Sequence, residues 1–318
     1  MIDQIAELLK HDKAGDPVRG LKWTRKTTRK VAGQLRKVGI HISANTVGRL
    51  LKKMGFSLRV NQKTLESGNK NPPPRRVRNR QFKYINTKRD QFASQQLPIV
   101  SVDTKKKEMV GNFKNNGTAW GTESYQVKDH DFRSDAKGMA IPYGILDTQT
   151  NQGFVVVGTC RETPAFAVDA IVLWWKTSGR LLYSWSDQLL ILADCGGGNN
   201  ARARAWKYHL QHELCDPYQL TVTVCHYPPG ASKWNPIEHQ LFSHISSNWA
   251  GIPLESYETV LNYLRTTRNS SGLHVSARLV NKSYEKGERI SQNDMDQLAL
   301  TRHKILPRWN YTVAPSKM

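Results

Sequence analysis

The sequence of 318 residues predicts an α/β fold, a mixed sheet flanked by helices on both faces, preceded by an all-α module. Two observations support this class. Up to about residue 68, apolar residues recur at helical spacing, whereas from residue 97 onward short apolar runs of strand length follow one another. These runs first form a hairpin and then alternate with helical patterns, which is typical of a sheet covered by helices.

The positive charge is concentrated in the amino-terminal part of the chain. The protein carries 47 Lys and Arg against 26 Asp and Glu, a formal net charge of +21. Residues 1–98 account for +17 of this charge, and 13 basic residues but no acidic one lie between Pro17 and Leu65. A region of one charge sign joined to a nearly balanced body is typical of a protein that binds a polyanion.

A membrane surface is the competing polyanion. No apolar stretch approaches the roughly 18–20 residues of a membrane span, and the amino terminus lacks a signal-peptide pattern. The four cysteines form no C-x-x-C pair, which favours reduced thiols over a zinc site or disulfides. We therefore expect a cytoplasmic, nucleoid-associated protein that binds nucleic acid and no membrane.

Residues 1–68 are predicted to form a helix-turn-helix region. A short helix and a connector in residues 1–20 precede a helix over 27–38, and Ser43 then caps a second helix that ends before Gly55. The second helix carries Asn and basic residues on the side opposite its apolar stripe, as the recognition helix of a DNA-binding protein does. A solvated basic face on a small helical bundle stays open as the alternative. The candidate DNA contacts of this region are Arg25, Lys26, Asn45, Arg49, Lys52 and Lys53.

Residues 69–96 are predicted to be a basic linker and a helix. Asn71–Arg78 contains three consecutive prolines, so we expect an extended stretch there. Its Arg75, Arg76 and Arg78 are candidates for contact with a phosphate backbone, although a plain spacer explains them equally well. Residues 79–96 are expected to be helical.

The core is predicted to span residues 97–250, and residues 251–318 are expected to pack on it as an extension with one helix near 254–267. The predicted core strands are 98–103, 141–146, 154–159, 189–193 and 220–225, and the predicted core helices are 164–176 and 201–214. A turn at 151–153 joins the second and third strands as a hairpin. The strand at 220–225 is expected to be the final one before the helix that carries Glu238, and residues 252–318 are expected to add less regular structure around their helix.

Three acidic residues occupy positions where an apolar or inert residue is usual. Asp103 and Asp194 each end a strand-like apolar run, and Glu238 lies in an apolar helical stripe. A carboxylate in such a place costs free energy unless a cation meets it. Two-metal phosphoryl transfer uses carboxylates held close together, and Mg²⁺ prefers oxygen ligands. We therefore expect the three acids to converge on a divalent metal site.

Each acid also has a structural explanation. Asp103 could pair with a lysine of 105–107, and Asp194 could cap the turn that follows it. The glycines at 196–198 are interpreted as room for a metal ion and the DNA backbone. Glu238 could complete a capping box with Asn235 as the N-cap. Three acids on suitable elements downstream of a basic module favour the catalytic interpretation.

Four segments of the sequence are distinctive, namely IVSVDTKKKE, KGMAIPYGILD, LLILADCGGGN and CHYPPGASKWNPIEHQLFSHISSNW. Together they resemble the Rhodopirellula-type DDE transposases, the ISAzo group of bacterial insertion sequences. The NPIE of the last segment is also similar to the third-acid motif of the mariner-type superfamily. The similarity runs from about residue 15 to 314 and includes LKWTRKTTRKVAGQL, SANTVGRLLKKMGFSLR and RWNYTV.

This resemblance implies an RNase H-like core with an acid triad of Asp103, Asp194 and Glu238. It implies two Mg²⁺ ions, for which Mn²⁺ can substitute, and cleavage at terminal inverted repeats followed by strand transfer into target DNA. A homo-oligomer on paired DNA ends is expected. His130–Phe132 and Asp147 also match the family, but we assign them no catalytic role: Asp147 is expected to close a turn. His226 is expected to be a packed strand-end histidine, and contact with phosphate stays open as the alternative.

Two other functions stay open. One is a truncated or repurposed DNA-binding protein without catalysis, a repressor or titrator, because members of the family extend further upstream than Met1. The other is a nuclease of the same fold that acts on RNA or DNA junctions. It would explain the acids but not the basic module.

Overall fold

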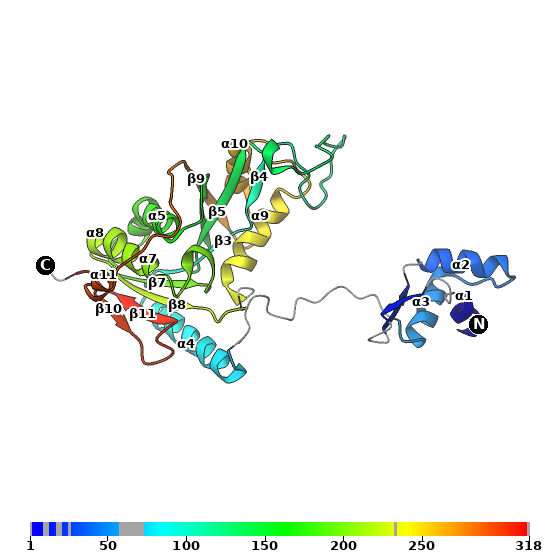
Figure 1. The fold of residues 1–318 in the computed structure, drawn as a ribbon, viewed down its shortest axis with the longest axis horizontal. Coiled ribbons are helices and arrows are strands. Elements are labelled where there is room, and N and C mark those ends of the chain that lie inside the picture. The colour runs from blue at the N-terminus through cyan, green and yellow to red at the C-terminus, as the bar shows by residue number, and fades with distance from the viewer. Residues whose placement is uncertain are drawn as a thin grey trace. The chain divides into compact units, whose positions relative to one another are not determined.

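The computed structural model describes residues 2–8, 13–16, 21–24, 27–56, 73–231 and 234–316. The chain divides into two compact units, Met1–Leu65 and Glu66–Met318 (Figure 1). Within the described ranges, no helix is both long enough and apolar enough to cross a membrane.

The described residues of the amino-terminal unit form three short helices. These are α1 (Ile2–Leu8), α2 (Thr28–Lys37) and α3 (Ala44–Lys53). The predicted caps are confirmed: Thr27 Oγ1 accepts the Lys30 N–H at 3.2 Å, and Ser43 Oγ accepts the Thr46 N–H at 3.1 Å. The helices pack around a small apolar cluster of Ile5, Val31, Leu35 and Val47.

The expectation that this unit is all-α was wrong. Strand β1 (Lys13–Asp16) pairs antiparallel with β2 (Leu21–Thr24), and Lys13 lies opposite Thr24. The sequence of β1, KAGD, shows no alternation of apolar and polar residues. Because main-chain pairing with β2 holds the strand in place, a pattern of side chains did not reveal it.

The second unit is built on one nine-stranded sheet with the order β10-β11-β8-β7-β3-β5-β6-β9, and β4 pairs with β5 beside this path. Strands β3, β7 and β8 run parallel to one another, whereas β5 is antiparallel to both β3 and β6. The strands are β3 (Ile99–Thr104), β4 (Glu108–Val110), β5 (Gly138–Asp147), β6 (Gln152–Gly158), β7 (Gln188–Ala193), β8 (Thr221–His226), β9 (His274–Val280), β10 (Leu300–Arg302) and β11 (Asn310–Val313).

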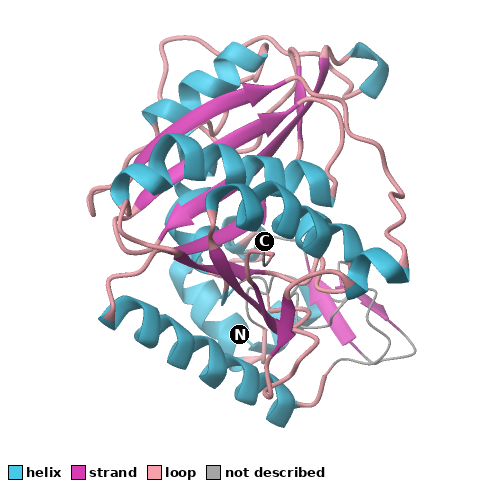
Figure 2. Cartoon of the chain, turned by 90° about the vertical axis from the view of Figure 1, so that its left-hand side faces the viewer, coloured by secondary structure: helices cyan, strands magenta, loops and turns pink. Residues whose placement is uncertain are grey.

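Helices cover both faces of this sheet, as predicted from the strand–helix alternation (Figures 1 and 2). One face packs on α5 (Pro164–Trp174), α7 (Arg204–His209) and the π-helical turn η4 (Leu210–Cys215). The other face packs on α4 (Arg75–Ser94) and on the π-helical turn η6 (Glu238–Phe242) with α9 (Ser243–Asn248) and α10 (Tyr257–Thr266). Shorter elements of the unit are η1 (Arg133–Asp135), η2 (Trp175–Gly179), α6 (Arg180–Leu182), η3 (Gly197–Asn199), α8 (Asp216–Tyr218) and α11 (Gln292–Asp296).

Two further sequence expectations were wrong. The stretch with Arg75, Arg76 and Arg78 is not extended but forms the first turn of α4, which begins directly after Pro74. Proline is compatible with a helix start because its missing N–H is not needed there.

The expectation of less regular structure in residues 252–318 is the second one, because β9, β10 and β11 complete the sheet on both edges. These strands pair with partners that lie far away in the sequence. Strand β11, for example, pairs with β8, and Asn310 lies opposite Cys225. Residues beyond 250 therefore form part of the sheet itself in addition to covering it.

Candidate active site

Asp103 and Asp194 lie at the ends of neighbouring parallel strands. In the register of β3 and β7, Val102 lies opposite Ala193, so the next residues, Asp103 near the end of β3 and Asp194 just after β7, lie side by side. Asp103 is only 8% exposed, and Asp194 is partly buried. The register thus places these two candidate site residues next to each other.

The two carboxyl groups destabilise each other's charged form. Burial raises the pKa of Asp103 to about 8, and repulsion by Asp194, Glu238 and Glu162 adds to this effect. The Thr104 N–H, which donates to Asp103 Oδ1 at 2.7 Å, lowers the pKa only in part. Burial also raises the pKa of Asp194, although Asp194 accepts the Gly196 N–H at 3.0 Å. The site thus brings together acidic groups whose simultaneous ionisation is unfavourable unless a cation meets them.

The lysines that follow Asp103 are paired elsewhere. Lys105 Nζ lies 3.2 Å from Glu108 Oε1, and Lys107 Nζ lies 2.8 Å from Glu162 Oε2. Lys106 also contacts Glu108, at 3.6 Å. Among the described residues, no basic side chain forms an ion pair with Asp103 or Asp194, so neutralisation by a neighbouring lysine does not explain the acids.

Glu238 opens the π-helical turn η6. Its carbonyl oxygen accepts the Ser243 N–H, five residues later, and such turns recur at functional sites. The apolar residues around it are buried, whereas Glu238 itself is half-buried. Burial raises its pKa and repulsion by Asp194 adds to this, while His239 and Lys105 lower it. Glu238 therefore belongs to the same electrostatic cluster as the two aspartates.

The side chain of Asn235 serves a different purpose from the predicted N-cap. It is fully buried and bonds to β3: Ser101 Oγ donates to Asn235 Oδ1, and Asn235 Nδ2 donates to Val102 O at 3.2 Å. Ser101 Oγ in turn accepts the Ile237 N–H at 3.2 Å. The helix start is thus capped by a residue of the strand that carries Asp103.

Glu162 is a fourth acid at the site, and sequence analysis missed it. It lies just before the N-cap Thr163 of α5, where an acid usually serves only the helix start. Its Oε1 accepts the Gly198 N–H at 3.3 Å, and it contributes to the raised pKa of both Asp103 and Asp194.

The glycines after Asp194 leave room for protein atoms. A Cβ on Gly197, whose φ is +54°, would collide with Glu162 Oε1, and a Cβ on Gly198 would approach Thr163 O at 2.9 Å. The room predicted for a metal ion and DNA is taken, at these two positions, by Glu162 and the start of α5. Asp194 also closes the turn after it, as its structural explanation proposed.

His226 supports the backbone of Asp194. It is fully buried, and burial lowers its pKa to about 4, so the ring is neutral. Its Nδ1 lies 2.8 Å from Asp194 O and its Nε2 3.0 Å from Tyr311 Oη, which accepts the Trp206 Nε1–H at 2.8 Å. The prediction of a packed strand-end histidine is confirmed.

Asp147 closes the turn after β5, as predicted. Its Oδ1 accepts the backbone N–H of Gln149 at 2.9 Å, and its Oδ2 accepts the Tyr183 hydroxyl at 2.8 Å. His130 stacks on Phe132 with ring centroids 5.4 Å apart, and both side chains are exposed.

The donor chemistry of the acids fits a divalent cation, because carboxylate oxygens are the ligands that Mg²⁺ prefers. Within the described ranges, however, no three His, Cys, Asp or Glu side chains are grouped closely enough to hold an ion. Asp103, Asp194 and Glu238 thus share one electrostatic cluster but do not close around a common ion.

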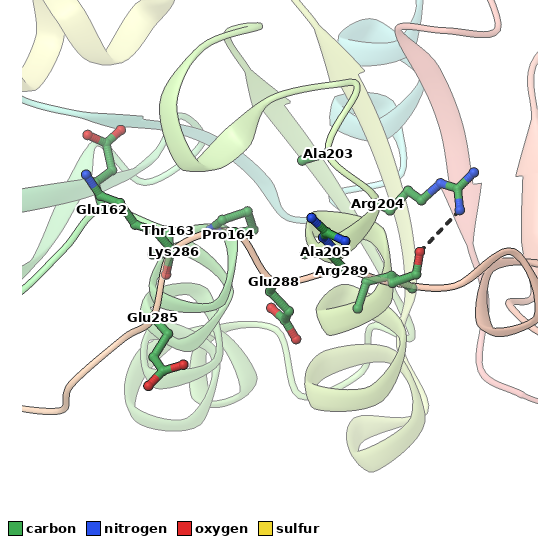
Figure 3. Close-up of a pocket in the computed structure, with 12 residues that line it drawn as sticks. Glu162, Thr163, Pro164, Ala203, Arg204, Ala205, Glu285, Lys286, Glu288 and Arg289 are labelled. Carbon is green, nitrogen blue, oxygen red and sulfur yellow. Dashed lines mark hydrogen bonds between the residues drawn. The ribbon is translucent and has the colours of Figure 1, made fainter.

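Two cavities flank the acids. One, of about 320 Å³, has Glu238 in its wall together with Lys105, Asn115 and Ser246. The other, of about 550 Å³, lies between the starts of α5 and α7 and the segment 285–290 (Figure 3). Its lining carries acidic and basic side chains in equal number, namely Glu162, Glu285, Glu288, Arg204, Lys286 and Arg289. The larger cavity therefore offers no surplus of positive charge for a phosphate backbone.

The candidate DNA contacts fall into three groups. Arg25 and Lys26 lie outside the described residues. The candidates on α3 are all exposed, on the side away from the buried Val47; they are Asn45, Arg49, Lys52 and Lys53. On α4, Arg75 and Arg76 are exposed and Arg78 is half-buried.

A family model described as the Rhodopirellula transposase DDE domain matches residues 4–315. Solved structures of Mos1 transposase are also similar. The mariner Mos1 paired-end complex with Mn is 17% identical and has a TM-score of 0.45, and the match covers 83% of this chain and 70% of that chain. The Mos1 strand transfer complex is 18% identical and has a TM-score of 0.44, and the match covers 83% of this chain and 69% of that chain. No curated protein matched the sequence.

Proposed function

Because this chain belongs to the Rhodopirellula transposase DDE domain family, we propose that it cleaves DNA at transposon ends and transfers the strand into target DNA. Asp103, Asp194 and Glu238 are its catalytic acids in this proposal. The observation that carries it concerns two aspartates at the ends of adjacent strands, of which Asp103 is buried and Asp194 partly buried. Among the described residues, neither has a basic ion-pair partner. The order of the central strands, β6-β5-β3-β7-β8, supports an RNase H-like core.

The three acids would hold two Mg²⁺ ions, or Mn²⁺ in their place. Bound there, such ions supply an activated nucleophile and stabilise the leaving oxygen. The protein's own contribution is placement. The strands fix Asp103 and Asp194, since their backbones are paired on both sides. The partly exposed Glu238 remains reachable through the cavity at its side.

The amino-terminal region supplies DNA binding in this proposal. The exposed basic face of α3 contacts the terminal inverted repeats, and the arginines at the start of α4 contact phosphate groups. We assign recognition to residues 1–68, the connection to 69–96, catalysis to 97–250 and support of the core to 251–318. Two copies of the chain act together on paired ends.

The proposal is tested by removing the charge of each acid without changing its size. Asp103→Asn, Asp194→Asn and Glu238→Gln should each abolish Mg²⁺-dependent nicking of a DNA fragment that carries the terminal repeat. The affinity for that fragment, measured by gel shift, should stay within about twofold. Asp90→Asn, at an exposed position on α4, is the matched control and should cleave normally. Cleavage by any of the three variants would contradict the assignment of that acid.

One observation favours a second function, a DNA-binding protein without catalysis: the acids are not closed around a common ion site in the described part of the chain. Such a protein would shift the repeat fragment in a gel but would leave it uncut with either Mg²⁺ or Mn²⁺. The same two assays on the wild-type protein therefore separate the two functions.

A further inference from the structure

We propose that Ser101 and Asn235 are positioning residues that set the place of Glu238 relative to Asp103 and so determine the affinity of the acids for a divalent cation. This inference rests on the proposed function. Neither residue contacts the reacting DNA in this proposal; both act through Glu238.

The two side chains join strand β3 to the start of the helix with Glu238. Ser101 Oγ donates to Asn235 Oδ1 and accepts the Ile237 N–H at 3.2 Å. Asn235 Nδ2 donates to Val102 O at 3.2 Å, and the Glu238 N–H bonds to Asn235 O at 3.1 Å. The side-chain bonds of the pair thus tie the strand to the helix start, and the last bond links Asn235 to Glu238 within the helix start.

The spacing of these residues places the connection beside both acids. Alternate residues of a strand point to the same face, so Ser101 and Asp103 share the face of β3 that meets the helix. Glu238 follows Asn235 by three residues, which is about one helical turn. A rotation or slide of the helix would therefore break the connection and move Glu238 away from Asp103 at the same time.

A second contact independently brings the helix close to this strand. Gly144 of β5 lies opposite Asp103, and a Cβ there would approach Ile237 Cδ1 at 2.9 Å and would collide with the ring of Phe242. The absence of a side chain lets the helix rest on the sheet next to Asp103. The packing supplies proximity, whereas the directional hydrogen bonds of Ser101 and Asn235 define one arrangement.

The polar character of the pair argues for this role. Both residues are fully buried in an otherwise apolar layer, where an unsatisfied polar group is costly. Apolar side chains would fill the same space without directional bonds. A buried polar pair is thus better suited to selecting one arrangement than to adding stability.

The test measures Mn²⁺ affinity by the electron paramagnetic resonance signal of free Mn²⁺, a measurement that does not depend on cleavage. Asn235→Ala should weaken Mn²⁺ binding about tenfold, the effect typical of a residue that supports a metal ligand. Ser101→Ala, a smaller change, provides a second variant if Asn235→Ala does not fold. Asn248→Ala is the matched control, because its side chain ties the other end of the same helix to Tyr263 O at 2.7 Å. It should stay within twofold of the wild type.

A double-mutant cycle separates positioning from general loosening. In a Glu238→Gln background, Asn235→Ala should cause no further loss of Mn²⁺ affinity if it acts through Glu238. Equal affinity of Asn235→Ala and the wild type, equal losses in Asn235→Ala and Asn248→Ala, or an additive cycle would each overturn the inference while leaving the proposed function intact. A wild-type protein that binds no Mn²⁺ would overturn both.

Discussion

Removal of the Asp103 charge should stabilise the metal-free protein even though it abolishes cleavage. The carboxyl group of Asp103 is buried next to Asp194, and its pKa is raised from 3.8 to about 8. Each pKa unit corresponds to about 1.4 kcal/mol, which sets an upper limit of about 5–6 kcal/mol on the cost of the charged form. An asparagine amide must also be desolvated, so we expect the free energy of unfolding of Asp103→Asn to exceed that of the wild type by about 1–3 kcal/mol.

The pH dependence gives this prediction its sign. The folded-state pKa of Asp103 lies above the unfolded value, so the stability it contributes is complete below about pH 4 and is lost as the pH rises through about 8. The stabilisation by Asp103→Asn should therefore be largest near pH 8 and should shrink toward pH 5. In thermal unfolding with EDTA at pH 8, we expect a melting temperature about 2–10 °C higher than that of the wild type.

The matched control is Asp90→Asn, which removes an exposed charge from α4 and should leave the melting temperature unchanged within about 1 °C. Addition of Mg²⁺ should raise the melting temperature of the wild type and should have little effect on Asp103→Asn. An Asp103→Asn protein that melts below the wild type at pH 8 in EDTA would refute the reasoning, because the carboxylate would then be stabilised in the folded state.

Two further predictions concern the surroundings of the acids and the amino-terminal unit. Glu162→Gln removes the ion-pair partner of Lys107, 2.8 Å away, but keeps an acceptor for the Gly198 N–H. We expect the rate of cleavage to fall about tenfold. Glu285→Gln, in the adjacent cavity, is the control and should cleave at the wild-type rate. Unchanged cleavage would show that Glu162 only shapes the loop. Lys52→Ala on the exposed face of α3 should reduce the slope of log affinity against log salt concentration, measured for the repeat fragment, by about one unit. An unchanged slope would show that Lys52 does not contact a DNA phosphate.

The features that the sequence predicted correctly are those that depend on near neighbours in the chain. Thr27 and Ser43 cap helices because each needs only an N–H three residues away. The run of apolar residues before Asp194 predicted a buried strand, and Asp194 duly follows β7. The parallel pairing of β7 with β8 is typical of consecutive strands that are connected by a helix.

The features that were missed depend on partners far away in the chain. Strand β11 is four residues long and is held between β8 and β10, so its own pattern is too short to be decisive. Glu162 joins the site only when the loop at 196–198 folds against it and the Gly198 N–H donates to its carboxylate. Likewise, Asn235 has the features of an N-cap in the sequence, and only the arrival of Ser101 from a strand 134 residues earlier redirects its side chain.

The position of β11 within the sheet has a consequence for biosynthesis. Residues 310–313 lie between β8 and β10, and Asn310 also exchanges two hydrogen bonds of 2.7 Å with Gln81 of α4. The ribosome must therefore release the chain beyond residue 310 before Gln81 of α4 can meet this partner. A premature stop codon upstream of residue 310 would leave an unpaired edge on β8, and the shortened product would be prone to aggregation and degradation.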